Sequence, residues 1–159
     1  MNDKRITILT DGSYNRKDNT CGYGNIIIDK DNNRIIKIGG VVTDPDLIKM
    51  WNVGGELEGA MRAINYCLDN KYNYLDLIYD YSGVYNWVRS DKPWKINEES
   101  NPAIKRYFNH IQDAMNSGLV INFIKIKGHT DPLHNLADEY ANKGRYASKD
   151  NPILAVDNI

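Results

Sequence analysis

Two aspartates stand directly after short apolar segments, where side chains are well placed to do chemistry. Asp11 follows the segment RITILT, residues 5–10, and Asp80 follows LDLIY, residues 75–79. Both segments predict buried strands, and open α/β sheets bind ligands at the carboxyl ends of their strands. Strand-end aspartates also form turns and cap helices, so position alone leaves a structural role open for both.

A glutamate on the first long predicted helix, residues 53–70, is the next candidate. Glu56 lies in line with a row of small residues that would let this helix approach the sheet closely. These residues are Ala60, Ala63 and Cys67. Glu58 lies on the opposite side with Arg62 four residues on, the spacing of a solvent-side ion pair. Glu56 is therefore the functional candidate of the two.

The last predicted helix, from Asn135 to about Lys143, carries two adjacent carboxylates. Asp138 and Glu139 flank its apolar face on either side, so helical geometry does not choose between them. On composition alone, both would be solvated surface charges.

Several carboxylates in one place favour hard divalent cations, which take oxygen ligands. Two such ions about 4 Å apart can activate a water molecule and stabilise the leaving oxygen of a phosphodiester. The sequence lacks the dense aspartate run of a helix-loop-helix calcium site, a Walker-type phosphate loop and a G-x-S-x-G nucleophile elbow. A Ser-His-Asp or Cys-His triad stays open on composition.

A mixed sheet with helices is expected to position these carboxylates. After residues 5–10, the runs GYGNIIID and RIIKIGGVV predict two further strands of an antiparallel three-strand meander. The helix that follows implies a crossover, which makes LDLIY a parallel neighbour of the first strand. Residues 119–127 predict a fifth strand, after a helix that begins at Asn101-Pro102. We therefore expect one α/β domain over residues 1–159, with an irregular tail at 146–159.

Composition limits the classes of protein to which the chain can belong. Its 159 residues suffice for one self-contained core. Two cysteines are too few for a disulfide framework and favour a reducing, cytoplasmic setting. No apolar stretch predicts a membrane span, and a net charge of −1 means that a nucleic acid would be held by local basic clusters. We expect a monomer.

Four segments, in chain order, resemble the motifs of type 1 ribonuclease H. ITILTDGS carries Asp11, and NVGGELEGAMRAI carries Glu56. LIYDYSGVYNWV carries Asp80, and KIKGHTDPLHNLADEYANKG carries Asp138 together with His129. The DYSGVYNWV and PWK segments look closest to bacterial members that elsewhere are fused to a small viroplasmin-like domain. The resemblance covers nearly the whole chain and selects Asp138 over Glu139.

The resemblance implies a ribonuclease H-like fold with a five-stranded mixed sheet flanked by helices. It also implies an endonuclease that hydrolyses the RNA strand of RNA/DNA hybrids and leaves 5′-phosphate and 3′-hydroxyl ends. Its two Mg²⁺ ions, for which Mn²⁺ could substitute, would be held by four carboxylates. By resemblance these are Asp11, Glu56, Asp80 and Asp138. His129 would assist proton movement or product release.

Two departures from the family pattern bear on this reading. The loop between His129 and Asp138 is about one residue shorter than usual and has Asp131-Pro132 where a glycine is common, so His134 is a possible stand-in for His129. The basic protrusion that holds the hybrid in some members is reduced to residues 90–100.

Contacts to the substrate are expected at a few polar and aromatic residues. Hybrid recognition needs contacts to RNA 2′-hydroxyls and a separate hold on the DNA backbone, and Asn52 is placed for the first by resemblance. The candidates for the second are basic residues that could bind phosphates, namely Lys17, Lys92, Lys95, Lys105, Arg106 and Arg89, together with Trp94, which could stack on sugars. The alternatives are a DNA nuclease or resolvase-type domain on the same fold, and a hybrid-binding module without catalysis.

Overall fold

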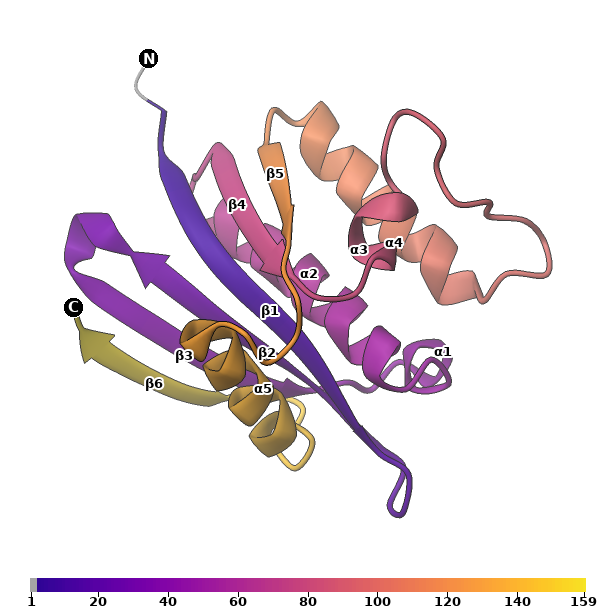
Figure 1. Cartoon of the computed structure of the whole chain (residues 1–159), viewed down its shortest axis with the longest axis horizontal. Helices are drawn as coiled ribbons and strands as arrows, with labels where there is room; N and C mark the ends of the chain where they lie inside the picture. The colour runs from indigo at the N-terminus through magenta and orange to yellow at the C-terminus, as the bar shows by residue number, and fades with distance from the viewer. Residues whose placement is uncertain (1–2) are drawn as a thin grey trace.

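The computed structural model describes residues 3–159 and contains one six-stranded sheet with helices on both faces (Figure 1). The strand order is β5-β4-β1-β2-β3-β6. A single 3₁₀ turn at Lys30–Asn32 joins β2 to β3. In chain order the elements are β1 (Arg5–Asn15), β2 (Thr20–Asp29), β3 (Arg34–Val41), α1 (Pro45–Ile48), α2 (Asn52–Asp69), β4 (Tyr74–Tyr79), α3 (Gly83–Asn86), α4 (Pro102–Asn116), β5 (Val120–Lys125), α5 (Pro132–Gly144) and β6 (Ile153–Asn158).

Strand β1 is the centre of the sheet and is buried on both faces. Ile6 and Ile8 belong to the main core, which includes the apolar face of α2. Leu9 points the other way and packs with Ile26 and with Ala137 of α5. Alternation along a strand sends neighbouring side chains to opposite faces, so one strand carries the packing of both helix layers.

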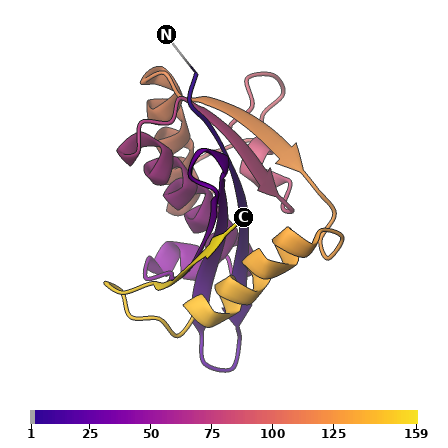
Figure 2. The same ribbon diagram turned by 90° about the vertical axis from the view of Figure 1, so that its left-hand side faces the viewer.

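Helix α5 covers one face of the sheet, and α2 with α1 and α4 covers the other (Figure 2). Two glycines make these close approaches possible. A Cβ at Gly12 would lie 2.3 Å from the backbone nitrogen of Glu56, and a Cβ at Gly24 would lie 2.1 Å from the carbonyl oxygen of Ala137. Because real Cβ atoms do not come so near, any other residue would push the helices off the sheet.

The predicted meander and the parallel pairing of β1 with β4 are confirmed. The predicted number of strands was wrong, because residues 153–158 form β6 instead of continuing an irregular tail. Strand β6 pairs antiparallel with β3 at the edge of the sheet. The prediction passed over the four-residue apolar run that begins at Ile153. One face of this edge strand meets solvent, and Leu154 and Val156 are exposed there.

Two element boundaries also differ from the prediction. Strand β1 does not end at Asp11 but pairs with β2 as far as Asn15. Helix α5 begins at Pro132 instead of Asn135, because the Asp131 side chain accepts hydrogen bonds from the first turn and Pro132 occupies its first position.

No helix within residues 3–159 is both long enough and apolar enough to cross a membrane. Cys21 and Cys67 are buried free thiols.

Candidate active site

The end of strand β4 opens a gap in the sheet beside β1. The pairing of β1 with β4 stops at Leu9 and Ile78, whereas β1 continues alongside β2. Asp11 lies on β1 just beyond that point, and Asp80 directly follows the last residue of β4. The two aspartates predicted from strand ends therefore share one location, although only Asp80 follows the end of its own strand.

Glu56 reaches this gap from helix α2. Its side chain is only 3% exposed, and its carboxylate accepts hydrogen bonds from the backbone N–H groups of Tyr81 at 2.7 Å and Asp80 at 3.3 Å. Glu58 forms the predicted ion pair with Arg62 at 3.7 Å, outside the pocket. Its side chain is only 15% exposed, so the expected solvent-side position was wrong.

The loop between β5 and α5 is tied to the same place by Asp80. The carboxylate of Asp80 accepts a hydrogen bond from the backbone N–H of Gly128 at 3.1 Å. A Cβ at Gly128 would lie 2.7 Å from the other carboxylate oxygen. A larger residue here would force the Asp80 carboxylate to move.

Asp138 completes the acidic group from helix α5, and a pocket of about 430 Å³ contains all four carboxylates. Both histidines considered from the sequence also line it. The lining residues are Asp11, Gly12, Asn52, Val53, Glu56, Asp80, Tyr81, Ser82, Lys125, Gly128, His129, His134 and Asp138. Residues from β1, α2, α5 and the segments after β4 and β5 therefore meet in one cavity.

Ionisation of Glu56 and Asp11 is disfavoured in this pocket. Within the described residues 3–159, none of them forms an ion pair with a lysine or arginine. Burial raises the pKa of Glu56 to about 8, and repulsion from Asp11 adds to the effect. Burial likewise raises the pKa of Asp11 to about 6, although attraction to His134 and the hydrogen bond from the Gly12 N–H offset part of the rise. Repulsion from Asp138 and Asp80 adds to it. Such a group suits a divalent cation, which would restore the charge balance.

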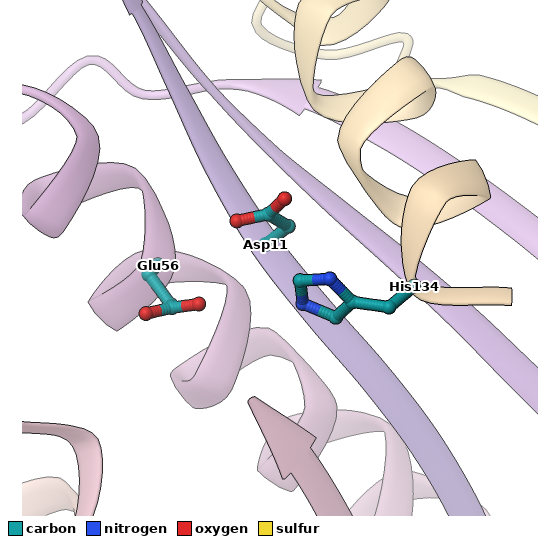
Figure 3. A group of neighbouring side chains, drawn as sticks. All are labelled: Asp11, Glu56 and His134. Atoms are coloured by element: carbon teal, nitrogen blue, oxygen red, sulfur yellow. The ribbon is translucent and has the colours of Figure 1, made fainter. Parts of the chain in front are cut away.

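The two histidines are placed very differently. His129 is exposed at the pocket mouth, in a loop where its φ angle is +63°. His134 is only 2% exposed and lies with Asp11 and Glu56 in a group whose donor atoms are all within 4.8 Å of one another (Figure 3). The sequence named His134 only as a stand-in for His129, but the structure places it inside the acidic group.

Comparison with known proteins identifies the family. The family model for RNase H matches residues 3–146, which is most of the chain. The chain belongs to the RNase H family. It is therefore a ribonuclease H enzyme, as the four sequence motifs predicted. No protein among curated sequences matches the chain.

Solved structures share the RNase H fold with this chain at low sequence identity. RNase H1 from the halophilic archaeon Halobacterium salinarum NRC-1 has 17% identity and a TM-score of 0.68, covering 88% of this chain and 96% of its own. The N-terminal RNase H domain of a Mycobacterium tuberculosis protein has 17% identity and a TM-score of 0.66, covering 89% and 98%. LC11-RNase H1, in complex with an RNA/DNA hybrid, has 20% identity and a TM-score of 0.65, covering 87% and 94%.

The residues predicted to hold the RNase H substrate are divided between the pocket and its surroundings. Asn52 lines the pocket at the start of α2. Lys17 lies in the exposed turn between β1 and β2, and Lys92 and Lys95 are exposed on the loop before α4. Trp94 is 41% exposed on that loop, and its ring packs edge-on against buried Trp87 with centroids 5.3 Å apart.

Lys125 is a site residue that the sequence reasoning missed. It is the last residue of β5, pairs in register with Tyr79 of β4 and lines the pocket. Because Asp80 follows Tyr79, the strand register alone could have indicated that Lys125 lies near that aspartate.

The closer resemblance to viroplasmin-linked members stays a prediction, as do the cytoplasmic location and the monomeric state.

Proposed function

We propose that this RNase H is an endonuclease that hydrolyses the RNA strand of RNA/DNA hybrids and leaves 5′-phosphate and 3′-hydroxyl ends. The observation that carries the proposal is the meeting of Asp11, Glu56, Asp80 and Asp138 in one pocket. Membership of the RNase H family supports the choice of substrate.

The four carboxylates would hold two divalent cations. Their oxygen atoms are the ligands that Mg²⁺ prefers, and Mn²⁺ is the alternative. When bound, the two cations would supply an activated water molecule and would stabilise the charge that develops on the phosphodiester. The site fits such ions because its carboxylate oxygens are gathered in one pocket, where a bound cation would offset the repulsion between Glu56 and Asp11.

The protein's own groups hold the site in shape and handle the proton. Two backbone N–H groups fix the carboxylate of Glu56, and the Gly128 N–H fixes that of Asp80. His129 at the pocket mouth would carry a proton to the departing 3′-oxygen or aid product release. Lys125 would attract the phosphate of the RNA strand into the pocket.

Recognition of the hybrid would use both edges of the pocket. Asn52 lines the pocket and would contact a 2′-hydroxyl of the RNA, the group that distinguishes RNA from DNA. Trp94 with Lys92 and Lys95 would hold the DNA strand by sugar and phosphate contacts, and Lys17 would extend the hold. LC11-RNase H1, which shares this fold, has been solved with an RNA/DNA hybrid.

A cleavage assay on matched duplexes tests the proposal. With Mg²⁺, we expect loss of the RNA strand in an RNA/DNA hybrid and no cleavage of double-stranded DNA. Asp80→Asn should slow cleavage by more than the ~100-fold that loss of an outer contact to a metal ligand costs. Asp69→Asn is the matched control, because Asp69 is exposed at the end of α2, and it should cleave at the wild-type rate.

Other outcomes would point to the alternatives. Equal cleavage of plain DNA would indicate a DNA nuclease or resolvase-type domain. Tight binding of the hybrid without cleavage, under Mg²⁺ and under Mn²⁺, would indicate a binding module. Product ends other than 5′-phosphate and 3′-hydroxyl would contradict the proposed direction of attack.

A further inference from the structure

His134 is held rigidly inside the acidic group. It is the third residue of α5, and the carboxylate of Asp131 accepts hydrogen bonds from the backbone N–H groups of Leu133 at 2.8 Å and His134 at 3.4 Å. Only 2% of the His134 surface is exposed, whereas His129 is an exposed residue. Its burial beside carboxylates calls for a different role.

One hydrogen bond fixes the tautomer of the His134 ring. Its Nε2 atom lies 3.0 Å from the carbonyl oxygen of Thr10. A carbonyl oxygen only accepts, so Nε2 must carry the proton, and the neutral ring then has its lone pair on Nδ1. Within residues 3–159 the ring makes no second hydrogen bond. Nδ1 therefore has no hydrogen-bond partner among the described residues, and His134 lines the pocket.

The carbonyl of Thr10 holds this ring because strand β4 ends where it does. The pairing of β1 with β4 stops at Leu9, which leaves Thr10 at the open edge of β1. Histidines that bind metal ions almost always donate their other N–H to a carboxylate or a backbone carbonyl. The bond from His134 to Thr10 is that arrangement, with the free nitrogen left for an ion.

The surrounding donors complete a group of the right size. Asp11, Glu56 and His134 each offer an atom, and these atoms all lie within 4.8 Å of one another. Figure 3 shows the imidazole facing the two carboxylates from the α5 side. Ligands at roughly 2.0–2.2 Å from one ion would lie about this far apart after small side-chain rotations.

We propose that His134 supplies a nitrogen ligand to a divalent cation held by Asp11 and Glu56, and that it shifts the preference of the site from Mg²⁺ toward Mn²⁺ and other first-row transition metals. Imidazole suits such metals, whereas Mg²⁺ favours oxygen ligands. The inference rests on the proposed metal-dependent function but adds a ligand that the four carboxylates do not include.

The direct test is a pulsed electron paramagnetic resonance experiment on the full chain with one equivalent of Mn²⁺ and no nucleic acid. We expect nitrogen coupling to the bound ion, shifted in protein labelled with ¹⁵N-histidine. The chain has three histidines, so single substitutions assign the signal. His134→Asn should abolish it, while His129→Asn and His110→Asn should keep it. Absence of nitrogen coupling in the wild-type protein, or its loss only in His129→Asn, would overturn the proposal.

Calorimetric titration measures the effect on metal choice. His134→Asn should weaken Mn²⁺ binding at least about tenfold and Mg²⁺ binding far less, so that the ratio of the two affinities falls. If His134 instead acts as a cation that neutralises Asp11, the substitution would tighten both metals, and the proposal fails. Circular dichroism checks that the variant folds. The electron paramagnetic resonance spectrum of the wild-type protein tests the proposal even if a variant fails to fold.

The cleavage assay separates this inference from the proposed function. Nitrogen coupling in a protein that cleaves no hybrid with any metal would contradict the proposed function and leave the ligand assignment standing. Cleavage of the hybrid without nitrogen coupling would support the proposed function and contradict the assignment of His134 as a ligand.

Discussion

The carboxylates of the site oppose the stability of the metal-free protein. Glu56 has a folded-state pKa of about 8 against an ordinary value of 4.5, first because it is buried and second because Asp11 repels it. A raised carboxyl pKa means that the folded state keeps a proton that the unfolded chain has released. The protein without metal should therefore lose stability as pH rises from about 4.5 to about 8, by up to about 1.4 kcal/mol per pH unit.

Glu56→Gln should stabilise the metal-free protein at pH 8 by on the order of 2 kcal/mol, because it removes a charge that the pocket disfavours. The amide oxygen can still accept the hydrogen bond from Tyr81. Thermal melting in EDTA between pH 5 and pH 9 would measure the effect. The same variant should lose hybrid cleavage and most of the stabilisation that Mn²⁺ or Mg²⁺ gives the wild-type protein.

Glu139→Gln is the matched control for this change. Glu139 is exposed on α5 and pairs with Lys143, so its replacement should leave the pH profile of melting close to wild type. If the Glu56→Gln protein melts at a lower temperature than wild type in EDTA at pH 8, the ionised Glu56 carboxylate does not destabilise the folded protein.

At the scale of elements, helix α5 matters most, because it carries both Asp138 and His134 into the pocket. Its start was mispredicted from the sequence, where the Asp131-Pro132 pair stood out only as a departure from the family pattern. The structure gives the pair a reason: Asp131 caps the helix and Pro132 fills its first position. These contacts place His134 in the first turn, facing Thr10.

Asp131→Ala should lower the free energy of unfolding by about 1 kcal/mol, the usual cost of losing an N-cap side chain. Because the first turn of α5 would fray, hybrid cleavage should slow more than the stability loss explains. Asp131→Asn should restore both, since asparagine caps as well as aspartate. Urea unfolding and cleavage rates measure the two effects. Equal damage from Asn and Ala would show that the charge of Asp131, not its capping bond, is what matters.

Across the whole molecule, the features that depend on residue spacing within one segment could be predicted from the sequence. The parallel pairing of β1 with β4 and the buried row of small residues behind Glu56 follow from alternation and helical spacing, and both are confirmed. Asp138 could not be told from Glu139 in this way, since α5 faces the sheet along a stripe that both flank. His134 was undervalued for a related reason. Its burial depends on where α5 begins and on an open edge of β1, which no single segment encodes.

Strand β6 went unpredicted because only its pairing with β3, far away in sequence, makes it a strand. Removal of residues 149–159 would delete this pairing and the ion pair of Lys37 with Asp157. We expect the free energy of unfolding to fall by roughly 1–3 kcal/mol, since a few net hydrogen bonds of about 1 kcal/mol each are lost. Solubility should also fall, because β3 becomes an exposed edge.

Hybrid cleavage by the truncated chain should nevertheless continue at the wild-type rate per folded molecule, measured below its melting temperature. No residue of this segment lines the pocket, and α5 is held mainly by the central strands. Leu154→Lys is the control for surface change without loss of pairing. That side chain is 61% exposed, so stability should move by no more than ~0.5 kcal/mol. A truncated chain that folds but cleaves poorly would mean that β6 fixes the position of α5, and through it the positions of Asp138 and His134.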